Sequence, residues 1–277
     1  MEGGKIDEMA IRLKLRKSKL IVVKVGASSL SDENGKIDFE KINSICVEIS
    51  NLRRRGINVV LVSSGAIKAG KAIISDSLKN NEISSLQAFA AVGQVLLMES
   101  YRDLMAAKGY KVAQILLTWD DFRSKTRLKN LINTIQTLLS LGVLPIINEN
   151  DTIAVEEIKF GDNDTLSALV ATHLNSDLLV ILSDIDGLYS GDPSLPSSKL
   201  ISFVPEVTQE IEDLASSKHK GFGGMKTKLK AAKMANSFGI PMVIANGGEF
   251  GILERIIDGE RVGTLIGSRV KNEKRSL

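Results

Sequence analysis

Short apolar runs alternate with amphipathic stretches along most of this chain. The runs are continuous rather than alternating, which is typical of strands buried on both faces of a parallel sheet. We expect such strands at 20–26 (LIVVKVG), 58–65 (NVVLVSSG), 111–118 (KVAQILLT), 143–148 (VLPIIN), 177–184 (DLLVILSD), 240–246 (IPMVIAN) and 262–267 (VGTLIG).

The intervening stretches repeat apolar residues with a helical period. Helices are expected from Phe39 to Arg55, from about Ser84 to Lys108, around 128–139, over 164–175 and over 225–239. The alternating segment TIAVEEIKF at 152–160 predicts a hairpin. Strands separated by helices predict an α/β fold with a mostly parallel central sheet and helices on both faces. Right-handed crossovers then bring the carboxyl ends of the strands to one edge, where ligands bind.

Composition and charge exclude several classes of protein. Of the 277 residues only 4% are aromatic, so a stacking platform for single-stranded nucleic acid is not expected. The net charge of +3 comes from the two ends, because residues 12–19 alone carry five positive charges. The body at 20–268 is net negative and does not predict a nucleic-acid surface. No apolar run approaches the length of a membrane span.

Cysteine and histidine are too few for disulfide or zinc chemistry. The single cysteine, Cys46, lies on a helical apolar stripe and is expected to be a buried, inert thiol. With only two histidines beside it, the chain lacks ligands for a zinc site. We expect a cytoplasmic protein in a reducing compartment, without a signal peptide.

Two lysine-containing segments could bind an anion. Lys24 lies inside an apolar strand directly before Gly26, Ala27 and Ser28, whose small size lets backbone N–H groups approach a phosphate. The alternative is an edge-strand lysine with its tip in water. The second segment, Lys218–Lys233, runs from a glycine-rich loop into a helix, where exposed N–H groups and the helix dipole favour an anion. A solvated lysine-rich helix face is the alternative there.

Short polar residues gather after two of the expected strands. The clusters are Asn148–Asp151 and Gly161–Asp164, separated by the expected hairpin. They could bind an ammonium group or hold lysines in place. Such residues also make turns and cap helices, and Asp164 could be the N-cap of the next helix.

A third segment only partly matches a phosphate-binding loop. Gly65 to Lys71 follows a strand and fits the pattern Gly-x4-Gly-Lys. The next residue is Ala72 rather than Ser or Thr, so the hydroxyl that ligates Mg²⁺ in such loops is missing. We therefore do not favour this segment as a nucleotide site.

Taken together, these segments resemble the amino acid kinase family over about residues 19–268. The strings that carry the resemblance are VVKVGASSL, VSSGAIKAG, AFAAVGQ, LLT at 116–118, PIINENDT, KFGDNDTLSALVA, LSDIDGLYSGDP and GGMKTKL. Their order and spacing are more specific than any one of them. The strings favour the branch that uses MgATP to phosphorylate the side-chain carboxylate of L-glutamate, the first step of proline biosynthesis.

The resemblance implies a three-layer α/β/α sandwich and a role for each matching residue. It implies one domain with an N-lobe at about 19–175 on the substrate and phosphate side and a C-lobe at about 176–268 on the nucleotide side. A basic extension at 1–18 and a basic tail at 269–277 flank it, and no C-terminal PUA domain is expected. Implied catalytic residues are Lys24, Lys228 and Asp164; substrate-binding residues are Ser64, Asp151 and Asn163; the phosphate loop is Gly26, Ala27 and Ser28; and ATP-binding residues are Lys24, Ser183, Asp184, Phe222, Gly223, Gly224, Met225, Lys226, Thr227 and Lys228.

The resemblance also implies ligands and partners. ATP and Mg²⁺ are expected, with the metal carried by ATP rather than by a protein cage, and L-glutamate is the expected substrate. Proline is expected as a feedback inhibitor, and a homodimer or homotetramer as the assembly. The family usually has Thr at Phe222 and often Ser at Lys226, so these two positions depart from its pattern.

Two alternatives stay open at this stage. One is another member of the family that acts on acetylglutamate, aspartate, carbamate or a nucleotide monophosphate. The other is a non-catalytic amino-acid sensor with the same fold, against which the presence of both lysines argues.

Overall fold

The computed structural model describes residues 7–74, 82–153, 163–215 and 223–267. Its strands join in one sheet of order β3-β4-β2-β1-β5-β7-β8-β6, in which only the β7–β8 pairing is antiparallel. The strands are β1 (Leu20–Val25), β2 (Asn58–Ser63), β3 (Lys111–Leu117), β4 (Val143–Glu149), β5 (Leu178–Ser183), β6 (Phe203–Val204), β7 (Met242–Asn246) and β8 (Thr264–Ile266).

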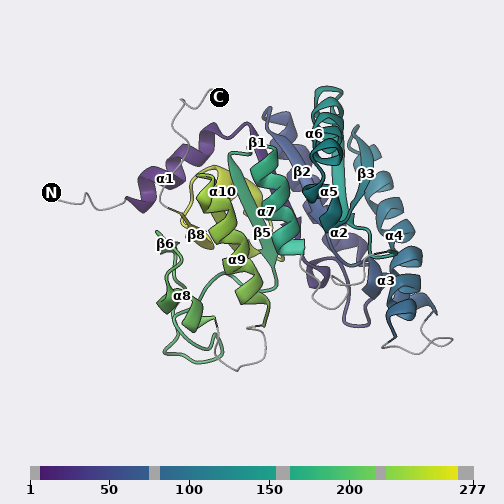
Figure 1. Ribbon diagram of the computed structural model, residues 1–277. Helices are drawn as coiled ribbons and strands as arrows, with labels where there is room; N and C mark the ends of the chain where they lie inside the picture. Colours follow the sequence, from purple (N-terminus) through teal and green to yellow (C-terminus); the bar gives the residue numbers. More distant parts are fainter. Residues whose placement is uncertain (1–6, 75–81, 154–162, 216–222, 268–277) are drawn as a thin grey trace.

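Helices cover both faces of this sheet, as Figure 1 shows. The described helices are α1 (Glu8–Lys14), α2 (Phe39–Arg54), α3 (Ala66–Ile74), α4 (Ile83–Ala106), α5 (Trp119–Arg123), α6 (Lys125–Ser140), α7 (Asn163–His173), α8 (Gln209–Leu214), α9 (Gly223–Ser237) and α10 (Ile252–Ile257). Among these described residues, no helix is long and apolar enough to cross a membrane.

Successive residues of each central strand face opposite sides and so build two separate cores. In β1, Val23 and Val25 pack with α2, α4 and α10, whereas Val22 packs with α6, α7 and α9. Lys24 shares the second side, since it is two residues from Val22. The predicted three-layer α/β/α sandwich is confirmed, and it aims Lys24 toward α7 and α9.

The carboxyl ends of six strands lie together because β3, β4, β2, β1, β5 and β7 run parallel. The chain passes from β1 to β2 on one side and later adds β5 on the other, so β1 and β5 mark a topological switch point. A ligand cleft is expected at such a point, outside the carboxyl ends of the strands.

Residues 8–17, which belong to the expected basic extension at 1–18, are helical and pack on the C-terminal part of the chain. Ile11 and Leu15 are buried in the core. Arg12 is fully buried and donates to the carbonyl oxygens of Ser202, Glu260 and Val262, each at 2.9 Å. Burial lowers the pKa of this guanidinium, with Glu8 acting in the opposite direction. Arg12 therefore joins α1 to the segment before β8.

The segment that partly matched a phosphate-binding loop is a helix-packing motif. Gly70 lies inside α3, where an added Cβ would come within 1.8 Å of the Phe89 carbonyl oxygen on α4. Gly93 on α4 is equally close to the Ala66 carbonyl oxygen, at 1.8 Å. The two glycines let α3 and α4 cross with their backbones in contact. Gly70 of the Gly-x4-Gly-Lys pattern is therefore required by the contact between α3 and α4, and it is not part of a phosphate-binding loop.

Most predicted elements lie within a few residues of the observed ones, but the short helices α5 and α8 and the two-residue strand β6 were not predicted, and neither were α1 and α3. The pattern did not predict α1 or α3, because α1 was read as a charged end and α3 as part of a loop motif. Cys46 is buried as predicted, and burial raises the pKa of its thiol to about 12. The predicted hairpin at 152–160 lies almost wholly outside the described residues.

Candidate active site

Lys24 lies on a central strand rather than at an edge. Strand β1 pairs with β2 on one side and β5 on the other, and Lys24 is 8% exposed. The structure therefore excludes the alternative of an edge lysine with its tip in water. A buried ammonium needs a partner, since an unpaired one costs several kcal/mol.

The partner of Lys24 is Asp164, which also binds a second lysine. Nζ of Lys24 lies 2.8 Å from Oδ1 of Asp164, and Nζ of Lys228 lies 3.4 Å from Oδ2. The Thr227 hydroxyl donates to the same Oδ2 at 2.7 Å. Because Asp164 is 4% exposed and Lys228 is 8% exposed, the three charges form a buried cluster with one excess positive charge.

The two lysines determine the charge state of Asp164. Burial on its own would raise the pKa of this carboxyl group. The charges of Lys24 and Lys228, together with hydrogen bonds from Lys24 and Thr227, outweigh burial and hold the pKa below its ordinary value. Asp164 is therefore ionised at neutral pH. Asp164 lies in the first turn of α7. The alternative that it is the N-cap of this helix is therefore wrong.

Helix α9 begins at this cluster. Its first N–H groups have no partners within the helix, and the dipole gives this end a positive potential. The Gly224 carbonyl oxygen accepts from Nζ of Lys228 at 3.2 Å and from the Thr227 hydroxyl at 2.9 Å. An added Cβ at Gly224 would lie 3.3 Å from Nζ of Lys228, so glycine leaves room for the lysine tip.

The other predicted residues of the glycine-rich loop behave differently from one another. Met225 is 3% exposed and belongs to the apolar core, so only its backbone can face a ligand. Lys226 is exposed on the first turn of α9. Gly223 begins the helix, and Phe222 lies outside the described residues.

The predicted phosphate loop follows β1 and forms a short 3-10 turn at Ala27–Ser29. The Gly26 N–H donates to the Leu182 carbonyl oxygen of β5 at 3.2 Å, so it is not available to a phosphate. In this respect the prediction for Gly26 is corrected. The N–H groups of Ala27 and Ser28 begin the turn, where a helix has no internal acceptors for them.

The predicted pair Ser183 and Asp184 lies at the end of β5, beside this turn. The Ser183 hydroxyl donates to Oδ1 of Asp184 at 3.1 Å. The Gly247 N–H donates to the Ser183 carbonyl oxygen at 2.8 Å, which ties the ends of β5 and β7 together. Ser183 is buried and Asp184 is exposed, so the carboxylate faces solvent.

Two of the predicted substrate residues, Ser64 and Asn163, contact each other. Nδ2 of Asn163 donates to Oγ of Ser64 at 2.8 Å, to Oδ1 of Asn148 at 3.0 Å and to the Ser63 carbonyl oxygen at 3.3 Å. Oδ1 of Asn163 is buried and has no hydrogen-bond partner among the described residues. A buried acceptor without a donor is unfavourable, so this atom is suited to a donor on a ligand.

The charged cluster and the amides meet at the start of α7, because Asn163 and Asp164 are consecutive. The structure thus brings Lys24, Lys228 and Asp164 together and places Ser64 and Asn163 next to them. Asp151 lies in the turn after β4 and is partly exposed.

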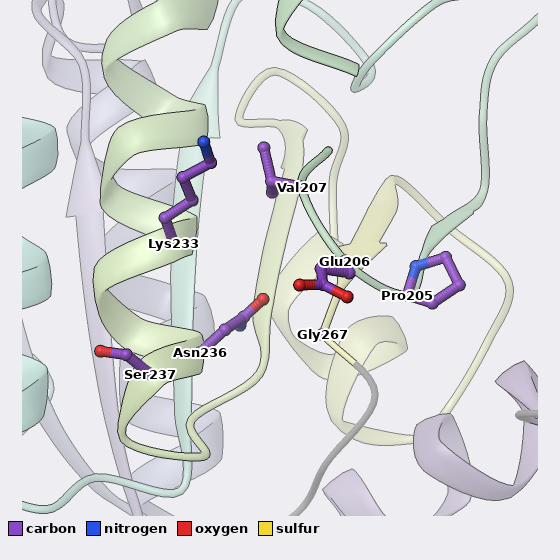
Figure 2. Close-up of a pocket in the computed structure, with 7 residues that line it drawn as sticks. All are labelled: Pro205, Glu206, Val207, Lys233, Asn236, Ser237 and Gly267. Atoms are coloured by element: carbon purple, nitrogen blue, oxygen red, sulfur yellow. The ribbon is translucent and has the colours of Figure 1, made fainter. Parts of the chain in front are cut away.

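Two cavities lie near helix α9. The larger has a volume of about 530 Å³. It lies where β6 and β8 end, and Ile266 of β8 pairs with Met242 at the start of β7. This cavity therefore lies at the amino-terminal ends of the central strands. Lys24 and Lys228 lie at the opposite, carboxyl ends of these strands. Lys233, Asn236 and Ser237 of α9 line one side of the cavity (Figure 2). The other lining residues are Pro205, Glu206, Val207 and Gly267.

The smaller cavity is beside the candidate site. It has a volume of about 240 Å³ and lies between α8 and the first turns of α9. Gln209 and Glu212 line one side, and Lys226 and Leu229 the other. Lys226 is the predicted site residue that this cavity includes.

Sequence reasoning missed several contacts of the site. It did not predict that the Thr227 hydroxyl donates to Asp164. It assigned nothing to Gln94, whose Oε1 accepts from Nδ2 of Asn148 at 2.8 Å, or to Tyr101, whose hydroxyl lies 3.0 Å from Oγ of Ser63. Gln94 does lie in the string AFAAVGQ, and a polar residue on an apolar helix face was the available signal.

The geometry of the site and the similarity of the chain to known proteins together define the class of protein. The model of the amino acid kinase family matches residues 19–246, and the chain belongs to this family. Its relatives include three proteins named glutamate 5-kinase. The one from Pelobacter propionicus is 48% identical over 253 residues, which is 90% of this chain and 68% of that protein. The one from Dictyoglomus thermophilum is 50% identical, covering 89% of this chain and 67% of that protein. The one from Clostridium tetani is 47% identical, covering 90% and 95%.

Solved structures show the same fold at low sequence identity. A UMP kinase from Bacillus anthracis matches with a TM-score of 0.62 and 17% identity, over 91% of this chain and 96% of that one. A carbamate kinase from Giardia lamblia bound to AMP-PNP matches with a TM-score of 0.64 and 18% identity, over 93% and 100%. The predicted amino acid kinase fold is therefore confirmed.

Proposed function

We propose that this protein transfers the γ-phosphoryl group of ATP to the side-chain carboxylate of L-glutamate. The product is L-glutamyl 5-phosphate, and the reaction is the first step of proline biosynthesis. The observation that carries the proposal is the buried Lys24–Asp164–Lys228 cluster, next in the chain to Asn163, whose Oδ1 has no hydrogen-bond partner among the described residues. Relatives at 47–50% identity with this printed activity support the choice of substrate.

The chemistry asks for positive charge rather than for a base. A glutamate carboxylate is already ionised at neutral pH, so no proton has to be removed before attack. The difficulty is repulsion between this carboxylate and the phosphates, and phosphoryl transfer spreads negative charge over the equatorial oxygens. Lys24 and Lys228 would offset this charge from fixed positions, and Asp164 holds the two ammonium groups near each other.

Backbone groups add to this potential. The first N–H groups of α9 at Gly223–Lys226 and those of Ala27 and Ser28 would bind phosphate oxygens. Ser183 and Asp184 would contact the nucleotide, and the cavity beside Lys226 offers room on the same side. In this proposal the N-lobe at about 19–175 binds glutamate and phosphate, and the C-lobe at about 176–268 binds the nucleotide.

Mg²⁺ would enter with ATP. Both oxygens of Asp164 are engaged by lysine and threonine side chains, so this carboxylate fits an organising role better than a metal-ligating one. When bound, Mg²⁺ neutralises charge on the phosphates. Phosphate oxygens and water would supply most of its ligands.

The amide side fits the amino-acid end of L-glutamate. Oδ1 of Asn163 would accept a hydrogen bond from the α-ammonium group, and Ser64 and Asp151 would complete the contacts. An N-acylated amino acid has one N–H and no charge there, so it satisfies this acceptor less well. Proline keeps a protonated ring nitrogen and an α-carboxylate, and we include feedback inhibition by proline in the proposal for this reason.

A cytoplasmic homodimer or homotetramer completes the proposal. Strand β3 lies at the edge of the sheet, and α6 packs beside it on the neighbouring β4, with only Ile135 buried among its apolar residues. Leu141, which follows this helix, is 70% exposed. An unpaired edge with an apolar flank suits a second copy of the chain. Light scattering after gel filtration would measure the assembly.

The direct test is ADP release by the purified protein with ATP, with and without Mg²⁺ and proline. L-glutamate should support turnover, proline should lower it, and hydroxylamine should trap the acyl phosphate as a hydroxamate. N-acetyl-L-glutamate, L-aspartate, carbamate and UMP are the matched comparison substrates. Turnover with one of these and not with L-glutamate would replace the proposal by another activity of the family, and no turnover at all would favour a sensor.

A further inference from the structure

Helix α4 contributes a buried amide to the substrate side although it is not part of the cleft. Gln94 is 9% exposed and faces the sheet, and its Oε1 accepts from Nδ2 of Asn148 at 2.8 Å. Gly93, directly before it, is the residue at which α4 touches the α3 backbone. The position of Gln94 is thus fixed by close helix packing.

A chain of three amides runs from Gln94 to the substrate site, and its polarity is set. Oδ1 of Asn148 accepts from the Glu149 backbone N–H at 2.9 Å, and a backbone N–H can only donate. Nδ2 of Asn148 must therefore face Gln94. The same Oδ1 accepts from Nδ2 of Asn163, so Oδ1 of Asn163 is the buried atom of this chain that has no hydrogen-bond partner among the described residues.

We propose that Gln94 is a positioning residue that makes the site select an amino acid with an unmodified ammonium group. It holds Asn148 in the orientation that turns the oxygen of Asn163, and not its NH₂ group, toward the ligand. The Ser63 carbonyl oxygen, 3.3 Å from Nδ2 of Asn163, supports the same orientation. The inference rests on the proposed function and names the group of the substrate that this amide chain recognises.

The consequence is specific to one group of the substrate. With methionine at position 94, Nδ2 of Asn148 loses its acceptor in a buried place, so Asn148 and the Asn163 amide bonded to it are no longer held from the side of α4. Binding of the ammonium group should weaken, whereas binding of the side-chain carboxylate and of ATP should not. Glutarate lacks the ammonium group, so its kcat/KM measures the contribution of the other contacts of the site.

The experiment compares kcat/KM for L-glutamate and glutarate in the wild-type protein and in Gln94→Met. The ratio of the two values should fall about tenfold, with the glutarate value and the KM for ATP within about twofold of wild type. If glutarate is not phosphorylated, its inhibition constant against L-glutamate replaces its kcat/KM. Gln94→Glu keeps an acceptor oxygen and should restore most of the ratio.

The matched control is Ser100→Ala on the same helix. Ser100 is also buried, but its hydroxyl bonds the Leu96 carbonyl oxygen of its own helix at 2.8 Å, so both substrates should behave as in wild type. An equal fall for L-glutamate and glutarate in Gln94→Met would show a merely structural role and overturn the inference, as would an unchanged ratio. Should Gln94→Met fail to fold, Gln94→Asn repeats the test. Absence of L-glutamate turnover in the wild type would instead remove the proposed function itself.

Discussion

Asp164 and Glu48 are both buried carboxylates, yet their environments shift their pKa values in opposite directions. Asp164 is 4% exposed and lies between Lys24 and Lys228, which hold its pKa below the ordinary range although burial opposes them. Glu48 is 2% exposed on α2, and burial raises its pKa to about 7. Backbone N–H groups of Leu253 and Gly251 lower the pKa of Glu48 and nearby Glu254 raises it, but no cation is among these causes.

The difference shows what the two lysines do. Burial alone disfavours a carboxylate, as at Glu48, whose Oε2 accepts from the Leu253 N–H at 2.7 Å and joins α2 to the start of α10. At Asp164 two ammonium groups reverse that effect. Such a pair of buried cations around one anion suits a site that receives a second anion, and we assign that anion to the transferred phosphoryl group.

The largest expected effect is loss of rate on removing either lysine. Lys24→Ala and Lys228→Ala should each lower kcat at saturating substrates by about 10²–10³, by analogy with the loss of an oxyanion-hole donor. The KM for L-glutamate should change much less, because in the proposed mechanism the two lysines contact the phosphoryl group rather than the amino-acid end of the substrate. Lys230→Ala, an exposed lysine two residues further along α9, is the control and should keep wild-type kcat. A near-wild-type kcat in either test variant would remove that lysine from the mechanism.

The second effect concerns the carboxylate itself. Asp164→Asn leaves two buried ammonium groups without their anion and should lower the free energy of unfolding by about 3 kcal/mol at pH 7. Since the folded pKa of Asp164 is depressed, its contribution is present above the unfolded pKa, near 3.8, and is lost as the pH falls through the folded value. Urea unfolding at pH 7 and at pH 3 should therefore show a smaller difference between the two proteins at pH 3. Equal stability at pH 7 would contradict the ion-pair account.

The smallest effect should have the opposite sign. Because Glu48 has a raised folded pKa, the folded state binds its proton more tightly, and stability should fall as the pH rises from about 4.5 through about 7. Glu48→Gln keeps an oxygen for the Leu253 N–H and never ionises. It should be more stable than wild type by about 2 to 3 kcal/mol at pH 8 and no more stable at pH 4, below the unfolded pKa. A destabilised variant at pH 8 would show that Glu48 is stabilising as an anion.

Sequence patterns predicted the sheet well because the central strands are buried on both faces and their apolar runs are unambiguous. They failed for α3, whose Gly70 is needed for contact with the α4 backbone, a tertiary requirement with no local signal. They also failed for α1, because the apolar positions Ile11 and Leu15 are spread among charged residues.

Within the site, the sequence located Lys24, Asp164 and Lys228 through an out-of-place charge, a polar cluster and a glycine-rich loop. It could not show that the two lysines bind different oxygens of the same Asp164 carboxylate. Nor could it show the contact of Thr227 with Asp164, or of Gln94 with Asn148, since these join residues that are 63 and 54 positions apart.

The most direct test of the paired lysines is a crystal structure with a non-hydrolysable ATP analogue, Mg²⁺ and L-glutamate bound. The account predicts that Nζ of Lys24 and Nζ of Lys228 both lie within hydrogen-bond distance of oxygens on the terminal phosphate, with a glutamate carboxylate oxygen in line behind its phosphorus. A structure in which either ammonium group points away from that phosphate, or in which the nucleotide binds elsewhere, would contradict it.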